Sequence, residues 1–291
     1  MHNTVKIGLV SDLHLEELPL LINKTRKDQT TKLESIKGIK KIPPPKEKLD
    51  LLLVAGDVCE LRHTELFREF LVNLKPYAST IVVIPGNHEY WKITYQHREK
   101  YIKAITDGLE HVVYLENQAV EVNGVHIFGT CLWPDFDKNQ YIMHEIQDRY
   151  SPILFDKNLN QIKWQRPRGY GKTKSINIYG LHTEAKQKFS NWLDSTKNAD
   201  KRILLSHYPP TPDSVLALKD EKIDRELREA FKRVDSADLT DLITEHQNLV
   251  ICHGHLHNEN KMYTTKSGHT AYLNPRGLYP NDEYNIMILE I

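Results

Sequence analysis

The sequence predicts an α/β fold, in which short buried strands alternate with amphipathic helices. Apolar runs rich in Val, Ile and Leu recur along the 291-residue chain, and several are separated by segments whose apolar residues follow helical spacing. Polar clusters rich in Asp and His directly follow five of these runs. Because ligands bind at the carboxyl ends of strands in open α/β sheets, these clusters are expected to form the functional site.

The predicted strands are nearly all apolar, so both of their faces are expected to be buried. They are Val5–Val10, Leu51–Ala55, Ile81–Ile84, Val125–Phe128, Arg202–Leu205, Leu249–Ile251, Thr270–Leu273 and Tyr284–Leu289. Apolar residues at helical spacing predict four helices between them. These are Thr64–Leu74, Tyr95–Thr106, Thr183–Lys197 and Ala237–His246.

Two basic segments interrupt the alternation of strands and helices. Residues 24–48 hold nine Lys and Arg against three Asp and Glu and end in three prolines, while residues 157–183 hold six Lys and Arg and no acid. Both are expected to be surface loops, the second with Trp164 and Tyr170 among its basic residues. Without an internal repeat or a clear linker, the chain is expected to be a single domain over residues 1–291 with two basic insertions.

Composition excludes several classes of protein. The 40% apolar and 27% charged content is that of a soluble globular protein, and equal numbers of Lys+Arg and Asp+Glu, 39 each, leave no net charge that would attract a membrane or nucleic acid. Three widely spaced cysteines fit neither a disulfide framework nor a zinc motif, and no apolar run approaches the roughly 18 residues of a bilayer span. A cytoplasmic protein is expected.

The polar clusters contain residue types and spacings suited to metal binding. Residues two apart point the same way in an extended segment, so Asp12 can converge with His14, and His255 with His257. In chain order the clusters are Ser11-Asp12-Leu13-His14, Gly56-Asp57, Gly86-Asn87-His88-Glu89, Ser206-His207-Tyr208 and His253-Gly254-His255-Leu256-His257.

Together these clusters offer two carboxylates, one amide and four imidazoles, too many ligands for one tetrahedral ion and enough for two if one carboxylate bridges. The mixture of oxygen and nitrogen ligands favours Mn²⁺, with Fe, Zn²⁺, Co²⁺ or Ni²⁺ as alternatives, over Ca²⁺ or Mg²⁺ alone. Two dications with Asp12, Asp57 and a bridging hydroxide keep a net positive charge that attracts a phosphate ester. A carboxylate in place of the Asn87 amide would cancel that charge.

The motifs D-x-H, G-D, G-N-H-E, a lone His and G-H-x-H, in this order between residues 12 and 257, resemble the calcineurin-like metallophosphoesterase superfamily. The resemblance implies a four-layer α-β-β-α sandwich of two mixed β-sheets, with the metal site at the carboxyl ends of the strands. It implies that one metal is held by Asp12, His14, Asp57 and His257, and the other by Asp57, Asn87, His207 and His255, so that Asp57 bridges. His88 would face the substrate, stabilising the phosphoryl oxygens or protonating the leaving group.

Two further segments, Thr130–Phe136 and Asn274-Pro275-Arg276-Gly277, are similar to an uncharacterised group of bacterial and phage phosphoesterases. Arg276 follows a strand and is a candidate for contacting a substrate phosphate, with a structural salt bridge as the alternative. Val58-Cys59-Glu60 replaces the Arg-containing extension of the Ser/Thr protein phosphatases, which argues against protein phosphatase activity.

The sequence therefore predicts a metal-dependent phosphoric ester hydrolase in which a metal-bridging hydroxide attacks phosphorus. The expected substrate is a nucleotide or nucleic-acid phosphodiester, because the basic segment around Trp164 and Tyr170 suits single-stranded nucleic acid. The alternatives are a phosphomonoesterase acting on proteins or metabolites, and a binding scaffold without catalysis. Neither a membrane nor an obligate protein partner is expected.

Overall fold

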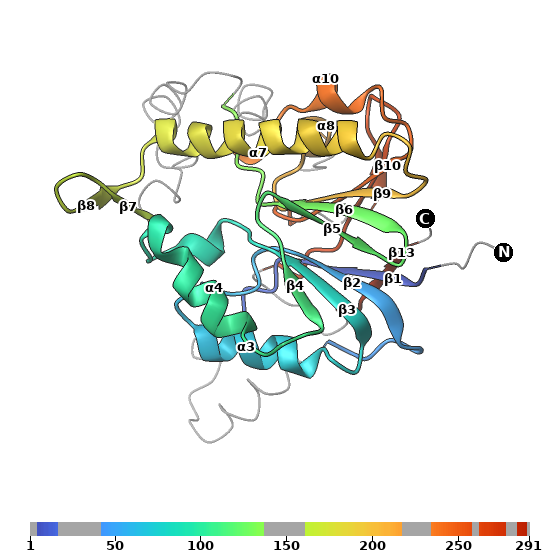
Figure 1. Ribbon diagram of the computed structural model, residues 1–291, viewed down its shortest axis with the longest axis horizontal. Helices are drawn as coiled ribbons and strands as arrows, with labels where there is room; N and C mark the ends of the chain where they lie inside the picture. The colour runs from blue at the N-terminus through green and yellow to red at the C-terminus, as the bar shows by residue number, and fades with distance from the viewer. Residues whose placement is uncertain are drawn as a thin grey trace.

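The protein is built from two mixed β-sheets that lie face to face between two layers of helices (Figure 1). The computed structural model describes residues 5–16, 42–136, 161–216, 234–257, 262–277 and 284–289. This is the four-layer α-β-β-α sandwich that the sequence predicts. No helix among the described residues is long and apolar enough to cross a bilayer.

The first sheet has five strands in the order β13-β1-β2-β3-β4. Strands β1, β2, β3 and β4 are parallel to one another, and β13 pairs antiparallel with β1. The strands are β1 (Ile7–Val10), β2 (Leu49–Ala55), β3 (Ala78–Ile84), β4 (Val112–Tyr114) and β13 (Met287–Leu289). Because β1, β2 and β3 run the same way, their carboxyl ends meet at one edge of the sheet.

The second sheet has six strands in the order β11-β12-β10-β9-β6-β5. Its central strands β12, β10, β9 and β6 are parallel, and β11 and β5 pair antiparallel at the two edges. The strands are β5 (Gln118–Val122), β6 (Val125–Thr130), β9 (Arg202–Ser206), β10 (Leu249–His253), β11 (Met262–Thr264) and β12 (Thr270–Leu273).

Alternating residues of the same strand build separate parts of the core. In β2, Leu51 and Leu53 pack between the two sheets with Ile203 and Leu205 of β9, and all four are fully buried. Leu52 faces the other way, toward the helices. A strand side chain alternates between the two faces of its sheet, so a strand covered on both faces has to be apolar throughout.

Helices cover the outer face of each sheet (Figure 1). On the first sheet, Phe67 and Leu71 of α3 (Thr64–Asn73) and Ile105 of α4 (Arg98–Thr106) pack in one apolar cluster. On the second sheet, Phe189 and Trp192 pack against strand residues. The helices there are α7 (Ser175–Ser195), α8 (Asp213–Leu216) and α10 (Thr240–Ile243), and two short 3-10 helices, η1 (His88–Tyr90) and η2 (Tyr95–His97), follow β3.

The structure corrects the expectation of a loop at residues 157–183. Lys163–Gln165 and Tyr170–Lys172 form a hairpin of strands β7 and β8, and α7 begins at Ser175, eight residues before the predicted start. Residues 175–182 extend the helix, although Gly180 and the turn-rich residues 166–171 before it favoured a loop. Residues 157–160, like residues 24–41 of the first basic segment, lie outside the described residues.

Strand β5 was not among the predicted strands. It pairs antiparallel with β6 through a two-residue turn at Asn123 and Gly124, which have φ values of 52° and 79°. An Asn-Gly pair between two strand-forming runs is a strong hairpin signal, so this strand was within reach of the sequence. At the C-terminal end, the predicted strand from Tyr284 begins at Met287, and α10 is shorter than the predicted Ala237–His246.

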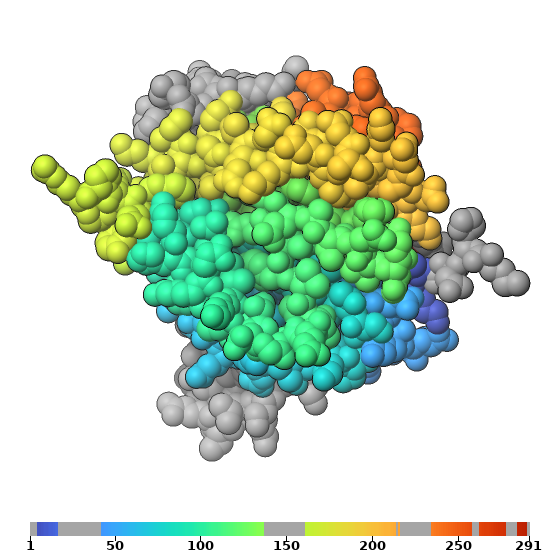
Figure 2. Space-filling view, in the orientation of Figure 1, coloured from blue at the N-terminus to red at the C-terminus, as the bar shows by residue number. Residues whose placement is uncertain are grey.

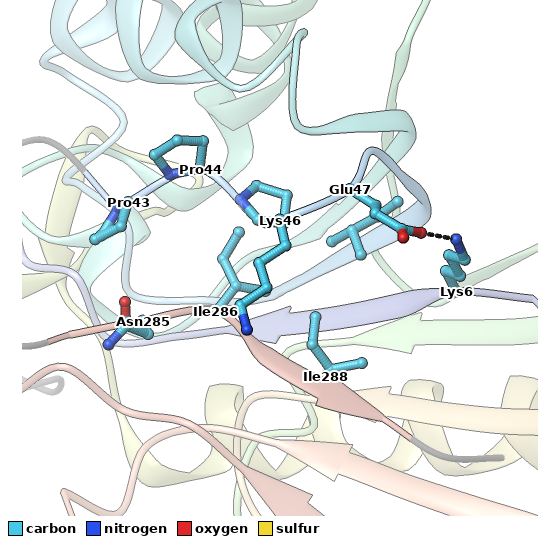
Figure 3. Close-up of a pocket in the computed structure, with 10 residues that line it drawn as sticks. Lys6, Pro43, Pro44, Lys46, Glu47, Asn285, Ile286 and Ile288 are labelled. Carbon is cyan, nitrogen blue, oxygen red and sulfur yellow. Dashed lines mark hydrogen bonds and ion pairs between the residues drawn. The ribbon is translucent and has the colours of Figure 1, made fainter.

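Space-filling atoms show a closely packed body from which the β7–β8 hairpin projects (Figure 2). A pocket of about 550 Å³ lies beside β13, where Pro43 and Pro44 face Ile286 and Ile288 (Figure 3). None of the predicted metal ligands lines this pocket. The predicted metal ligands lie instead at the carboxyl ends of the strands.

Candidate metal centre

The predicted ligands follow five strands whose carboxyl ends meet where the two sheets adjoin. Asp12, Asp57 and Asn87 follow β1, β2 and β3 of the first sheet. From the second sheet, His207 follows β9, and His255 and His257 follow β10. Residues from distant parts of the chain thus come together because strands of both sheets end at the same place.

One group of ligands gathers around His14. Its Nε2 atom lies 3.2 Å from Nε2 of His257 and 3.8 Å from Oδ2 of Asp57. The Nε2 atom of His257 lies 3.4 Å from Oδ1 of Asp12. Asp12, His14 and His257 offer ligand atoms that all lie within 4.8 Å of one another, close enough to hold a single ion.

A second group gathers around His207. Its Nε2 atom lies 3.4 Å from Oδ2 of Asp57 and 3.0 Å from Oδ1 of Asn87, while Nδ1 lies 2.9 Å from the carbonyl oxygen of Ala55. Asp57, His207 and His255 also offer ligand atoms within 4.8 Å of one another. The Oδ2 atom of Asp57 thus lies beside a histidine of each group, where a carboxylate shared by two ions would have to be.

Four of the candidate ligands have a strained backbone. Asp12, His14, Asp57 and His255 have φ values of 54°, 43°, 52° and 67°, in the left-handed region that few residues other than glycine adopt. Such conformations cost on the order of 1–3 kcal/mol each and are found mainly at functional sites. The hydrogen bond from Asp12 N to the carbonyl of Gly56, 3.0 Å long, helps to hold this geometry.

Two glycines allow the turns to approach one another. Gly56 has a φ of 80°, and a Cβ atom there would lie 2.6 Å from the backbone nitrogen of Gly86. At Gly254 a Cβ atom would lie 2.7 Å from Oδ2 of Asp12. Any side chain at these positions would push the ligand loops apart.

Glu89 ties two of the ligand loops together. Its fully buried carboxylate accepts hydrogen bonds from the backbone nitrogens of Asp57, Val58 and Cys59 after β2, at 3.0, 2.7 and 3.3 Å. It also accepts one from Gly86 N after β3, at 2.7 Å. These bonds set the separation between Asp57 and the loop that carries Asn87.

Comparisons with known proteins identify the family. Residues 5–259 match the family model described as calcineurin-like phosphoesterase, which covers most of the chain and includes every one of the seven candidate ligands. The chain belongs to the calcineurin-like phosphoesterase family. It is a phosphoric ester hydrolase.

Individual relatives of this calcineurin-like phosphoesterase are distant. An uncharacterised protein, L509, of Acanthamoeba polyphaga mimivirus is 24% identical over 209 residues, a match that spans 69% of this chain and 66% of the viral protein. The phosphopantetheinyl hydrolase PptH of Mycobacterium tuberculosis superposes with a TM-score of 0.69 at 19% identity, over 99% of this chain and 97% of its own, which shows a shared fold. A dimetal phosphatase of Danio rerio has a TM-score of 0.45 at 12% identity, over 94% and 88% of the two chains.

The charge states of the site suit metal binding. Burial would raise the pKa of Asp12, but the hydrogen bond and charge of His257 outweigh it and hold the pKa at about 2. Burial lowers the pKa of His14 to about 3, so this imidazole is neutral and able to act as a ligand at neutral pH. For His207, burial is outweighed by the charge of Asp57, which raises its pKa to about 9. Without a metal ion, a proton on His207 provides the positive charge beside Asp57. A bound metal ion would displace this proton.

Several observations test whether these residues fit metal ions. The Nδ1 atom of His14 is buried and has no hydrogen-bond partner among the described residues. Nitrogen atoms of His14 and His257 face each other at 3.2 Å beside buried carboxylates. Lone pairs of imidazole and carboxylate converging in this way are what a divalent transition-metal ion requires. The donor set therefore fits the dimetal chemistry of the family.

His88 lies at the edge of the metal centre and is held on several sides. Its backbone nitrogen donates to Oδ1 of Asp57 at 2.9 Å, and its Nε2 atom lies 4.0 Å from Oδ2 of the same residue. Its ring stacks on Trp91, with centroids 3.5 Å apart. Its Nδ1 atom lies 3.4 Å from Oε1 of Glu16, whose side chain is 5% exposed.

His257 is the most exposed of the candidate ligands. The side chain of His257 is 36% exposed, whereas those of His14 and Asp57 are 2% and 3% exposed. The backbone of Arg276 lies beside the first ligand loop. The backbone nitrogen of Arg276 donates to the carbonyl of Ser11, and that of Gly277 donates to the carbonyl of Asp12, both at 3.0 Å. The guanidinium is half-buried, and burial lowers its pKa. The structure thus places Arg276 next to the first ligand loop without assigning it a substrate.

Sequence reasoning assigned no role to three residues that contact the site. Glu89 is part of the G-N-H-E motif, and Glu16 follows His14 by two residues, so the same-side argument used for Asp12 and His14 would have found it. Asp235 had no signal in the sequence. Its Oδ1 atom lies 3.3 Å from Nε2 of His255, a contact made only by the fold.

Proposed function

We propose that this calcineurin-like phosphoesterase hydrolyses phosphodiesters, of a nucleotide or nucleic acid, with two divalent metal ions. Asp12, His14 and His257 would hold one ion, Asn87, His207 and His255 the other, and Asp57 would bridge the two. Mn²⁺ is the proposed metal, because the oxygen and nitrogen donors suit it. The observation that supports the proposal most strongly is that Oδ2 of Asp57 lies 3.8 Å from Nε2 of His14 and 3.4 Å from Nε2 of His207, close enough to share an ion with each.

Two bound ions would supply a hydroxide nucleophile at neutral pH and neutralise charge on the phosphoryl group. The protein itself contributes position and charge. Glu89 and the glycines of the loops hold the carboxylates in place before substrate arrives, so little reorganisation accompanies the reaction. Asn87 provides an oxygen without adding a negative charge that would repel an anionic substrate.

His88 is proposed as the group that protonates the leaving oxygen. Its imidazole borders the metal groups, with ring centroids of His88 and His14 4.4 Å apart, yet its side chain is still 12% exposed. A substrate entering beside His257 can therefore contact it. Burial lowers the pKa of His88, but the charge of Asp57 and the bond to Glu16 outweigh it, so the net shift is upward.

The test begins with hydrolysis of an aryl phosphodiester before and after chelation. Chelated enzyme should lose turnover and regain it when Mn²⁺ is added, and unchanged activity after chelation would exclude the proposed chemistry. His88→Ala should retain the metal ions but slow turnover by about 10²–10⁴-fold, the usual contribution of a general acid. His126→Ala serves as the matched control. His126 lies on β6, away from the metal centre, where it pairs with Glu121 of β5.

Substrate class is decided by a parallel assay of a diester and its monoester. A large preference for the monoester would replace the diesterase proposal with the phosphomonoesterase alternative. One structural neighbour is named a phosphopantetheinyl hydrolase, so a phosphopantetheinyl ester belongs in the same panel beside cyclic nucleotides and single-stranded DNA.

A further inference from the structure

The β7–β8 hairpin is a basic projection without a role in the metal centre. It extends from the body beyond the ends of α4 and α7 (Figure 1), and its atoms stand clear of the surface (Figure 2). Residues 161–175 contain five basic residues and no acid. These are Lys163, Arg166, Arg168, Lys172 and Lys174, all of them exposed.

One face of the hairpin is anchored. Trp164 stacks on Tyr95, with centroids 5.1 Å apart and planes inclined by 13°, and Ile162 at the base is buried in the core. The backbone nitrogen of Lys163 donates to the carbonyl of Ile93 at 2.9 Å, and Thr173 donates to Ile162 at 3.1 Å. The hairpin is therefore a supported arm and not a free loop.

The opposite face carries charge and one aromatic ring toward solvent. Lys163 pairs with Lys172 across the two strands, and Gln165 pairs with Tyr170, so these four side chains lie on the face opposite Trp164. Both lysines are exposed, so this face presents two cations at neighbouring positions.

The exposed ring adds a second kind of interaction. Tyr170 is 58% exposed and makes an edge contact with His97, at a centroid distance of 5.8 Å. Beside it is an open depression of about 370 Å³ lined by Gln96, His97, Glu99 and Lys100. A flat heterocycle stacked on Tyr170 would reach hydrogen-bonding groups in this depression.

A short series of contacts joins the hairpin to the segment that carries His88. Trp91 stacks on His88, and the next residue, Lys92, donates its backbone nitrogen to the carbonyl of Gln161 at 2.7 Å. Ile93 and Thr94 then pair with Lys163. Residues 88–97 therefore border the metal centre at one end and support the arm at the other.

We propose that the β7–β8 hairpin is a binding arm for single-stranded nucleic acid, which it guides toward the metal centre. A row of cations with an exposed aromatic ring matches a phosphate backbone with accessible base faces. A duplex hides its base faces, and the Asp and Glu side chains of an acidic peptide have no ring to stack on Tyr170. The inference rests on the proposed function, because the arm serves catalysis only if the metal centre cleaves the strand it holds.

Binding is measured first with chelator present, so that the arm is tested without the metal chemistry. The probe is a fluorescent oligothymidylate of about 12 nucleotides, within the usual length of a single-strand site. Simultaneous replacement of Lys163, Arg168 and Lys172 by Ala should weaken binding and reduce the slope of log affinity against log salt by about 2, since each phosphate contact contributes about 0.7. Arg166 is left unchanged because its guanidinium donates to the carbonyl of Lys172 and supports the turn.

The aromatic contribution is tested separately. Tyr170→Ala should lower affinity about tenfold with the salt slope unchanged, and Tyr170→Phe should restore it, because stacking needs the ring and not the hydroxyl. A control variant with the exposed residues Lys48, Lys75 and Lys197 changed to Ala removes the same charge elsewhere and should bind as the wild type does.

Hydrolysis then separates the arm from the metal centre. With Mn²⁺ present, the triple arm variant should cleave a small aryl phosphodiester at the wild-type rate but cleave the oligonucleotide more slowly. Binding that persists in a protein without any hydrolysis would support the arm while contradicting the proposed function. The arm itself is overturned if the triple variant binds as the wild type does, or if a polyglutamate peptide of similar length competes as well as the oligonucleotide.

Discussion

The Nδ1 atom of His88 lies 3.4 Å from Oε1 of Glu16, a carboxylate that reaches it from the other side of the first ligand loop. Trp91 covers one face of the same imidazole. The second oxygen of Glu16, Oε2, is buried without a hydrogen-bond partner among the described residues. Glu16 and Trp91 together limit the rotation of His88, so that its Nε2 atom stays near Asp57.

Glu16→Ala is therefore expected to impair His88 without removing the metal ions. Carboxylates that orient metal-ligating histidines contribute about 10–100-fold to activity, and a loss of similar size is expected for His88. The loss should be larger for an alkyl diester, whose leaving group needs a proton, than for a nitrophenyl diester, and Glu16→Gln should recover much of it because its amide oxygen still accepts a hydrogen bond. Equal losses on both substrates would mean that Glu16 only supports the loop.

Asn87→Asp tests the charge of the centre. The amide oxygen of Asn87 lies 3.0 Å from Nε2 of His207, and the residue is 5% exposed, so the nearly isosteric carboxylate fits the same space. We expect metal affinity to be kept or increased and kcat/KM for an anionic ester to fall by at least about tenfold, because a buried negative charge repels the substrate. Unaltered kcat/KM, with metal content verified, would show that the net charge of the centre does not control substrate binding.

Glu89→Ala should destabilise the fold through the two ligand loops. Four backbone N–H groups would lose their common acceptor, and a buried unsatisfied donor costs about 1–3 kcal/mol. The free energy of unfolding in urea, measured with chelator, should fall by at least about 3 kcal/mol, while Glu121→Ala on the surface should change it by less than about 0.5 kcal/mol. A fall no larger than that of the surface control would show that the four bonds contribute little.

The buried His182 gives a prediction for the pH dependence of stability. Its Nδ1 atom lies 2.9 Å from the carbonyl of Trp133, and burial lowers its pKa from 6.5 to about 4. Because the folded protein favours the neutral ring, this contribution is complete above pH 6.5 and is lost as the pH falls through 4. By linkage it amounts to about 3 kcal/mol.

His182→Asn is the matching variant, since its amide can still donate to the Trp133 carbonyl but does not titrate. As the pH is lowered from neutral toward 4, the free energy of unfolding should fall more steeply for the wild-type protein than for the variant. Urea denaturation at a series of pH values measures this difference. Parallel pH profiles would mean that His182 takes up a proton in the folded state without cost.

The sequence by itself determined the strands that are buried on both faces and the identity of the candidate ligands. Strand β2 was predicted from its apolar run Leu51–Ala55, because the part of a strand that is covered by a second sheet and by helices is apolar on both faces. Asp12, Asp57 and Asn87 were found because the loop after a strand is a local feature of the chain. Strand β4 was not predicted. Its three residues are only half-buried, and they form a strand because they pair with β3 at the edge of the sheet.

Only the tertiary structure decided which side chains meet. Glu16 and His88 are 72 residues apart, and Asp235 reaches His255 from a different element, so no spacing in the sequence relates them. The projection of the β7–β8 arm, and the exposure of Tyr170 on it, likewise follow from the stacking of Trp164 on Tyr95. Such contacts join residues that are far apart along the chain, whereas apolar runs and ligand spacings depend only on neighbours along the chain.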